Sequence, residues 1–127
     1  MPATAMNHFT VLTDDVPRTV QFYRDLLGLE EGPRPQFGFP GAWLYSGGVA
    51  ILHLIGGRSR AELKPGVIDH IAFSVVGLAE VLADLRTRGI EHTCERQAGT
   101  GTWQVFVLDP NGARVELDFA SSEVPSR

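Results

Sequence analysis

An internal repeat constrains the fold of this chain more than any other feature of its sequence. His8 is followed by His70 after 62 residues, and the segment ILHLI, residues 51–55, is followed by RVELD after 63 residues. A nearly constant offset between such landmarks indicates two copies of one supersecondary unit within the 127 residues. The fold must therefore contain the same order of elements twice.

The first copy, about residues 6–56, predicts the element order β-α-(β)-β-β. Asp14, Asp15 and Pro17 are typical of the first turn of a helix. Gly28 is typical of the end of that helix. The apolar residues of the helix recur at a helical spacing and form one face, which comprises Val16, Val20, Tyr23 and Leu27. The predicted strands are HFTVLT, AWLYS and VAILHLI, and the predicted helix is VPRTVQFYRDLLG.

The second copy, about residues 67–120, repeats this order. Its predicted elements are the strand VIDHIAFSVV, the helix GLAEVLADLRTRG, and the strands IEHTCER, TWQVFVL and ARVELDF. The polar stretch 57–66, marked by Gly and Pro, is typical of a linker, and residues 121–127 are typical of a loose tail. The sequence therefore predicts a single α+β domain over residues 1–127, built from two βαβββ modules.

Four potential metal ligands occupy equivalent positions in the two copies. His8 and His70 begin the first strand of each copy, and the 63-residue offset sets His53 opposite Glu116 on the last strand. If the copies pack around a pseudo-two-fold axis, the four side chains converge near it. Imidazoles combined with one carboxylate suit a first-row transition metal, and two histidines with one carboxylate are typical of non-haem Fe(II) sites.

His53 and Glu116 also have simpler interpretations. A histidine on an apolar strand is more often a core residue with satisfied hydrogen bonds, and a carboxylate on such a strand can be solvated. A ligand site explains His53 because a coordinating imidazole needs only one further partner for its second nitrogen. The coincidence of four ligand-type residues at equivalent places favours the metal site.

Composition argues against several other classes of function. The formal net charge is -4, whereas nucleic-acid binding requires a clustered basic surface. No apolar stretch approaches the length of a membrane span, and the N-terminus lacks the pattern of a secretory signal, so we expect no membrane partner and a cytoplasmic location. Cys94 is the only cysteine, which excludes an intramolecular disulfide.

The repeated unit and its motifs resemble the vicinal oxygen chelate superfamily, which includes glyoxalase I, extradiol dioxygenases, fosfomycin-resistance transferases and bleomycin-resistance binding proteins. The matching motifs are HFTVLTDDVPRTVQFYRDLLGL, DHIAFSV and FVLDPNGARVEL, within about residues 6–119. The resemblance implies a cupped mixed sheet with the helices on the outside, and it carries over His8, His70 and Glu116 as ligands of a divalent metal. It also implies a homodimer, with the site built within one chain or shared across two.

The residue at position 53 differs among the members of this superfamily, and three functions stay open. The first is an extradiol-type dioxygenase with Fe(II), in which His53 acts as acid and base, although Phe106 stands where such enzymes commonly carry a tyrosine. The second is a glyoxalase-like isomerase or lyase with Ni(II), Zn(II) or Mn(II), in which His53 is a fourth ligand in place of the usual carboxylate. The third is a metal-free binding protein of the bleomycin-resistance type.

An aromatic pocket is expected beside the metal, and its ligand is expected to be a small molecule. The resemblance turns position 106 inward, and the 63-residue offset makes Trp43 equivalent to Phe106. The candidate substrate-binding residues are Trp43, Tyr45, Gln104 and Phe106, whose surface suits a flat organic substrate. The alternative is that these residues belong to the core. The loop PRPQFGFPG is a candidate rim, with Phe37 or Phe39 over the mouth.

Overall fold

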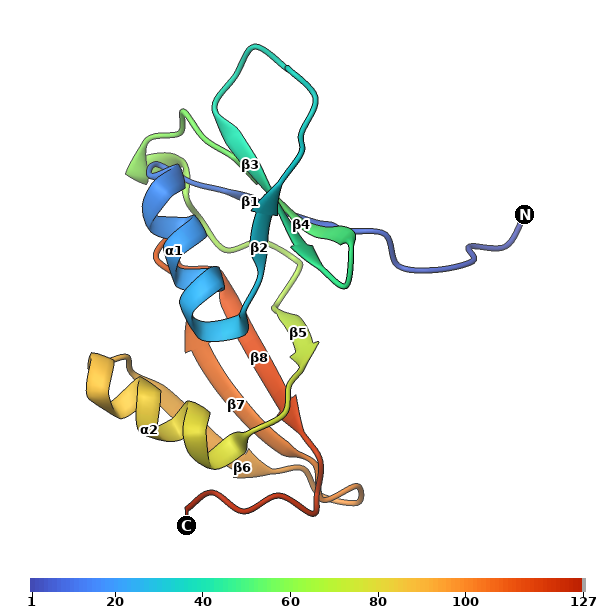
Figure 1. Cartoon of the computed structure of the whole chain (residues 1–127), viewed down its shortest axis with the longest axis vertical. Coiled ribbons are helices and arrows are strands. Elements are labelled where there is room, and N and C mark those ends of the chain that lie inside the picture. The colour runs from blue at the N-terminus through green and yellow to red at the C-terminus, as the bar shows by residue number, and fades with distance from the viewer. Residues whose placement is uncertain (127) are drawn as a thin grey trace. The chain divides into compact units, whose positions relative to one another are not determined.

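The computed structural model describes residues 1–126, and the chain forms two compact units, Met1–Lys64 and Pro65–Arg127. Each unit contains one α-helix and one mixed sheet of four strands (Figure 1). The boundary between the units lies inside the predicted linker 57–66, which also contains a short 3-10 helix, Arg60–Glu62. Within residues 1–126, no helix is long and apolar enough to cross a membrane.

In the first unit, the strand order is β1-β4-β3-β2. β1 (Phe9–Leu12) pairs in parallel with β4 (Val49–Ile55), which pairs antiparallel with β3 (Gly41–Ser46). The short β2 (Glu30–Gly32) completes the sheet beside β3, and α1 (Val16–Leu27) contacts both β2 and β3. This is the predicted β-α-(β)-β-β order.

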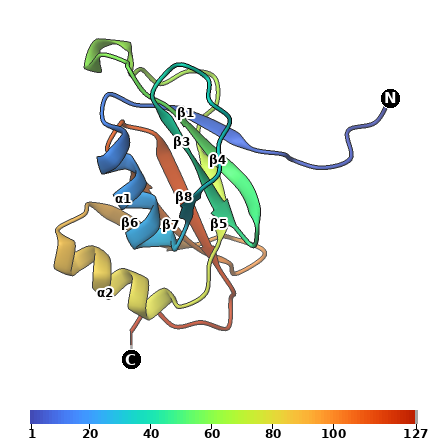
Figure 2. The same cartoon turned by 45° about the horizontal axis from the view of Figure 1, so that its top comes forward.

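The second unit repeats the arrangement with the strand order β5-β8-β7-β6. β5 (Ile71–Ser74) pairs in parallel with β8 (Arg114–Phe119), and β8 pairs antiparallel with β7 (Trp103–Leu108). β6 (His92–Arg96) forms the other edge, and α2 (Leu78–Arg88) runs alongside it in both views (Figures 1 and 2). The predicted pair of βαβββ units and the α+β class are confirmed.

The first strand of each unit is shorter than the sequence predicts. The parallel ladders begin only at Phe9 and at Ile71. His8 and His70 therefore lie one residue before their strands rather than within them, and their side chains are not committed to a face by the ladder. The two histidines occupy equivalent places in the two units.

The ends of α1 follow the predicted signals. The Asp15 carboxylate accepts a hydrogen bond from the Arg18 backbone N–H at 3.1 Å, which satisfies one free donor of the first turn. Gly28 ends the helix with a φ of 68°, a left-handed conformation that favours glycine. The buried face differs from the prediction in two positions, because Thr19 and Leu26 are buried whereas Val16 and Leu27 are only half-buried.

The two faces of β4 differ in burial. Leu52 and Leu54 on one face are 0% and 1% exposed, whereas His53 on the other face is only half-buried. Alternation along the strand therefore keeps the imidazole out of the apolar core. Glu116 occupies the corresponding face of β8.

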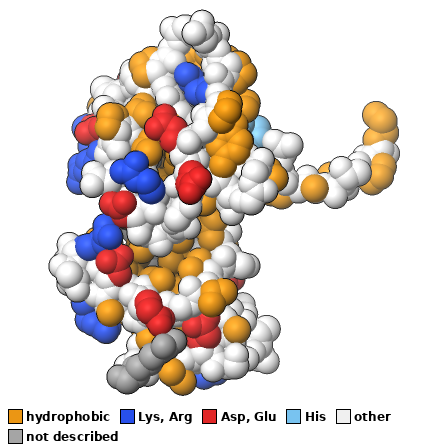
Figure 3. All heavy atoms as spheres, in the orientation of Figure 1, with side chains coloured by type: hydrophobic (Ala, Val, Ile, Leu, Met, Phe, Trp, Pro, Cys, Tyr) orange, Lys and Arg blue, Asp and Glu red, His pale blue; other side chains and the backbone are white. Residues whose placement is uncertain are grey.

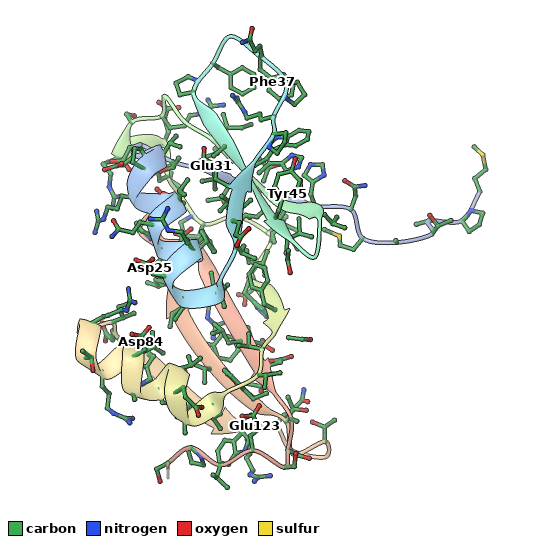
Figure 4. The ribbon with its side chains drawn as sticks, in the orientation of Figure 1. Asp25, Glu31, Phe37, Tyr45, Asp84 and Glu123 are labelled. Atoms are coloured by element: carbon green, nitrogen blue, oxygen red, sulfur yellow. The ribbon has the colours of Figure 1, made fainter. Side chains whose placement is uncertain are left out.

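The C-terminal segment, expected to be a loose tail over residues 121–127, is anchored at Glu123 in its described part, residues 121–126. The Glu123 carboxylate accepts hydrogen bonds from the backbone N–H groups of Gly77 and Leu78 at 3.1 and 2.8 Å, at the start of α2 (Figure 4). The Trp103 indole N–H donates to the Glu123 carbonyl oxygen at 2.8 Å. Gly77 has no side chain with which to cap the helix, so a carboxylate from the tail supplies the cap.

Candidate functional site

The first unit brings His8, His53 and Trp43 together in a stack of rings. The centroids of His8 and His53 are 3.8 Å apart with planes at 14°, and those of His53 and Trp43 are 4.1 Å apart at 11°. Trp43 and His53 are direct partners in the antiparallel register of β3 and β4. The sheet thus fixes two of the rings side by side, and His8 reaches the stack from the residue before β1.

Hydrogen bonds leave a different nitrogen available on each of these histidines. The His8 Nδ1 lies 2.7 Å from the Asn7 side-chain oxygen, and it donates because an amide oxygen only accepts. This leaves the Nε2 lone pair of His8 to bind a metal. The His53 Nε2 lies 3.2 Å from the Ala50 carbonyl oxygen and donates in the same way, which leaves Nδ1 of His53 as its basic nitrogen.

The environment of His53 favours its neutral form. Burial lowers the pKa of His53, and the neighbouring His8 lowers it further, whereas the hydrogen bond to Ala50 raises it. The net direction is downward, so the imidazole is neutral at neutral pH and can accept a proton or bind a metal.

The second unit brings His70 and Glu116 together. The His70 Nε2 and the Glu116 Oε1 are 3.0 Å apart, and the Gln104 amide donates to the other Glu116 oxygen at 3.1 Å. Glu116 is only 6% exposed, and a carboxylate so buried needs such partners. Gln104, a predicted substrate-binding residue, is thus also a direct support of Glu116.

Asp69 holds the other nitrogen of His70. The His70 Nδ1 lies 2.7 Å from Asp69 Oδ2, and the Arg114 guanidinium donates to the same oxygen at 2.8 Å. Hydrogen bonds from His70 and then from Arg114 lower the pKa of Asp69. Asn7 and Asp69 stand in the same relation to their histidines, so the two units repeat this supporting hydrogen bond as well as the histidine.

A second carboxyl group, Asp118, lies beside Glu116. Burial first, and then the neighbouring Glu116, raise the pKa of Asp118 to about 6. The hydrogen bond from Asp118 is the largest influence on Glu116 and lowers its pKa, against the opposing effect of burial. Asp118 is therefore the first of the two groups to take up a proton as the pH falls, and Glu116 stays ionised to lower pH. Among the described residues, Asp118 Oδ1 is buried with no hydrogen-bond partner.

Phe106 and Tyr45, the remaining predicted pocket residues, have different surroundings. Phe106 is the register partner of Glu116, as Trp43 is of His53, and its ring meets His70 edge-on at 5.6 Å between centroids. The Tyr45 hydroxyl instead donates to the Pro33 carbonyl oxygen. The structure thus brings Phe106 to His70 and Glu116, and it engages Tyr45 with the chain next to β2.

The donor atoms fit a divalent metal. Two ligand atoms about 2.1 Å from an ion and at right angles to each other lie about 3 Å apart, which is the separation of the His70 nitrogen and the Glu116 oxygen. The available Nε2 of His8 is of the same kind as that of His70. Within residues 1–126, no group of three or more His, Cys, Asp or Glu side chains is placed to hold an ion.

Sequence reasoning missed Asn7, Asp69, Asp118 and Arg34. The repeat could have revealed the first two, because each precedes a matched histidine by one residue. Asp118 lies two residues from Glu116 on the same strand face, so the alternation of side chains along the strand could have indicated it. Arg34 belongs to the loop before β3 and has no counterpart in the second copy, so no pattern indicated it.

Comparisons with known proteins agree with this fold. The family model described as Glyoxalase/Bleomycin resistance protein/Dioxygenase superfamily matches residues 5–117. Among curated proteins, "Glyoxylase I 4" from Arabidopsis thaliana is 31% identical over 122 residues, which cover 90% of this chain and 70% of that protein.

Solved structures resemble the chain over nearly its whole length. A glyoxalase family protein from Bacillus anthracis gives a TM-score of 0.77 at 23% identity, covering 94% of this chain and 98% of that one. A variant of the fosfomycin resistance protein FosX from Listeria monocytogenes, complexed with Mn(II) and 1S,2S-dihydroxypropylphosphonic acid, gives 0.77 at 16% identity and 95% coverage of both chains. Lactoylglutathione lyase from Agrobacterium tumefaciens gives 0.66 at 19% identity, covering 95% and 97%. At these identities the likeness concerns the fold.

Proposed function

The chain belongs to the Glyoxalase/Bleomycin resistance protein/Dioxygenase superfamily, and on that premise we propose that it is a metal-dependent enzyme acting on a small substrate with two adjacent oxygens. The proposed ligands of a divalent ion are His8, His70 and Glu116. The observation that carries this proposal is the 3.0 Å separation of the His70 and Glu116 donor atoms. The repeated support of the histidines by Asn7 and Asp69 adds to it.

The proposed metal is Fe(II), with Mn(II), Ni(II) and Zn(II) as alternatives. His8, His70 and Glu116 would hold the ion, which would supply polarisation of the chelating oxygens of a substrate and, as Fe(II), activation of dioxygen. A divalent ion is supported by the FosX structure of the same fold, which contains Mn(II).

His53 is proposed as the residue that transfers protons. Its lowered pKa keeps it unprotonated at neutral pH, and its bond to the Ala50 carbonyl leaves Nδ1 as the base. Stacking on Trp43 fixes the plane of the imidazole, so the base is held in one orientation before substrate arrives. In this role His53 accepts a proton from a substrate hydroxyl and later returns it.

Within this class we propose extradiol-type ring cleavage as the reaction. Two histidines and one carboxylate form the ligand set used for non-haem Fe(II), and the residue beside it is an imidazole rather than the carboxylate of an isomerase. The aromatic surface around Trp43 also suits a flat substrate.

A glyoxalase-like isomerase or lyase is the second candidate. The 31% identity to "Glyoxylase I 4" favours it, and so does Phe106, which lacks the hydroxyl of the tyrosine expected in an extradiol enzyme. In that case His53 is a fourth metal ligand, and the ion is Ni(II), Zn(II) or Mn(II).

Parallel assays on the full chain separate these candidates. The protein is loaded anaerobically with Fe(II) and given a panel of catechols while oxygen uptake and ring-cleavage absorbance are recorded; separate samples with Ni(II), Zn(II) or Mn(II) receive a hemithioacetal. Oxygen uptake that depends on both catechol and Fe(II) supports the dioxygenase. Background uptake with isomerisation of the hemithioacetal supports the second candidate.

A pair of histidine variants controls this experiment. His8→Ala removes a proposed ligand and is expected to abolish whichever activity is found, whereas His92→Ala, outside the ligand set, is expected to retain it. No activity in either assay together with no metal uptake contradicts the proposal and leaves a metal-free binding protein of the bleomycin-resistance type.

A further inference from the structure

A partly open cavity lies in the first unit beside the stacked rings. Its volume is about 130 Å³, and its lining comprises Thr10, Arg34, Phe37, Phe39, Trp43, His53, Leu54 and Ile55. Phe37 belongs to the loop between β2 and β3, which extends beyond the sheet (Figure 4). Hydrophobic side chains reach the surface in the same region (Figure 3). The cavity needs no residue of the second unit.

Arg34 gives this aromatic cavity a positive charge. Its guanidinium lies 5.0 and 5.1 Å from the ring centroids of Phe37 and Phe39, and it donates one hydrogen bond to the Phe39 carbonyl oxygen at 2.9 Å. The guanidinium of Arg34 lies close to Gly41. A Cβ at residue 41 would lie only 2.8 Å from the Arg34 Nη2, so the glycine leaves the space that the guanidinium occupies. The two rings and the Phe39 carbonyl oxygen therefore hold the guanidinium in place.

No carboxylate neutralises Arg34 within residues 1–126. Half-buried, it forms no ion pair in that range, and only one of its N–H groups has a hydrogen-bond acceptor. Removing a cation from water without a counter-ion is unfavourable, and a guanidinium pairs best with a planar oxyanion through two parallel hydrogen bonds. The uncompensated charge of Arg34 therefore favours an anionic ligand. The parallel N–H groups of its guanidinium favour a carboxylate.

The walls and the size of the cavity indicate the rest of that ligand. Phe37 and Trp43 lie with centroids 6.2 Å apart, and Phe37 also stacks on Phe39 at 5.2 Å. Aromatic walls favour a flat ring over a bulky aliphatic group. An engineered cavity of about 150 Å³ in another protein binds benzene, so a cavity of about 130 Å³ that opens to solvent accommodates one six-membered ring.

We propose that this cavity binds an aromatic carboxylate, with Arg34 pairing the carboxylate and the aromatic walls holding the ring. This rests on the proposed function, because His53 lines the cavity and the same ligand class would then be the enzyme's substrate class. Arg34 is accordingly a specificity-determining residue: it selects aromatic acids over neutral aromatic compounds.

The test uses the full chain without added metal and benzoate as the probe. The Trp43 indole N–H signal, assigned by its loss in Trp43→Phe, is followed by NMR during titration with benzoate, benzamide, cyclohexanecarboxylate or inorganic phosphate. We expect saturable shifts with benzoate and at least about tenfold weaker binding of the other three, since benzamide lacks the charge and the other two lack the flat ring.

Variants assign the charge selectivity to Arg34. Arg34→Gln is expected to weaken benzoate binding about tenfold, Arg34→Lys to retain part of the affinity, and Arg18→Gln, an exposed arginine on α1, to leave it unchanged. Thermal melts by circular dichroism confirm that each variant is folded. The inference is overturned if benzamide or phosphate binds as tightly as benzoate. It is also overturned if folded Arg34→Gln binds benzoate as tightly as the wild type does.

Metal binding separates this inference from the proposed function. Benzoate binding through Arg34 in a chain that takes up no metal leaves the cavity assignment standing and removes the enzyme. Metal uptake without selective binding of benzoate overturns the cavity assignment and leaves the proposed metalloenzyme standing.

Discussion

At the residue scale, one hydrogen bond recurs before the first strand of each unit. A side-chain oxygen of Asn7 or Asp69 accepts the Nδ1 hydrogen of the histidine that follows it, at 2.7 Å in both cases. Such a bond orients the imidazole and leaves Nε2 as the ligand atom. The support is therefore as much a part of the repeat as the histidines are.

Asp69→Ala is expected to weaken metal binding about 10- to 100-fold, because His70 loses the acceptor that orients it. Asp69→Asn keeps an acceptor oxygen, as Asn7 does naturally, and is expected to restore most of the affinity. A competition titration with a chromophoric chelator measures both variants, with Asp84→Ala on α2 as the control for a lost carboxylate. Equal affinities of wild type and Asp69→Ala would remove this role from Asp69.

His53→Gln separates the two roles proposed for His53. If His53 transfers protons, the variant retains the metal and loses turnover by about 100-fold or more. If His53 is a fourth ligand, the variant binds metal more weakly than the wild type. Metal content and steady-state rates on the same preparations decide between these outcomes, and retention of full turnover contradicts both roles.

At the scale of elements, α2 depends on a residue far from it in the sequence. Glu123 caps its first turn through the backbone N–H groups of Gly77 and Leu78. The apolar pattern and Gly89 predict the helix itself. The cap was not predicted because Gly77 offers no side chain, and a contact between residues 45 positions apart leaves no local pattern.

Glu123→Ala is expected to lower the free energy of unfolding by about 1–2 kcal/mol, because α2 loses both its cap and a negative charge at its N-terminus. Urea denaturation followed by circular dichroism measures the change in midpoint. The control is Glu91→Ala, an exposed glutamate between α2 and β6, which is expected to change it by less than about 0.5 kcal/mol. A midpoint for Glu123→Ala equal to that of the control would show that the tail does not stabilise the helix.

At the scale of the whole molecule, the repeat accounts for what could be predicted. Landmarks at a nearly constant offset implied the same elements twice, and the pairs Trp43–His53 and Phe106–Glu116 in the two registers follow the 63-residue offset. Features outside the repeat could not be predicted from the sequence. Arg34 lies in the loop between β2 and β3, whose counterpart in the second copy, residues 97–102, contains no arginine, and its position depends on contacts with side chains rather than on spacing.

The different pKa values of Glu116 and Asp118 also depend on tertiary structure. Alternation along β8 places both carboxyl groups on one face, but burial is what raises the pKa of Asp118 to about 6. A sequence pattern indicates the face, whereas the extent of desolvation depends on everything packed around it. This is why the ligand candidates could be predicted and their ionisation could not.

The most direct test of the account is the metal content of the full chain purified without chelators, measured by inductively coupled plasma mass spectrometry before and after reconstitution. We expect about one divalent ion per chain in the wild type and in His92→Ala, and loss of the ion from folded His8→Ala, His70→Ala and Glu116→Gln. Less than about 0.1 ion per chain in the wild type, with no uptake on reconstitution, would contradict the proposed metalloenzyme.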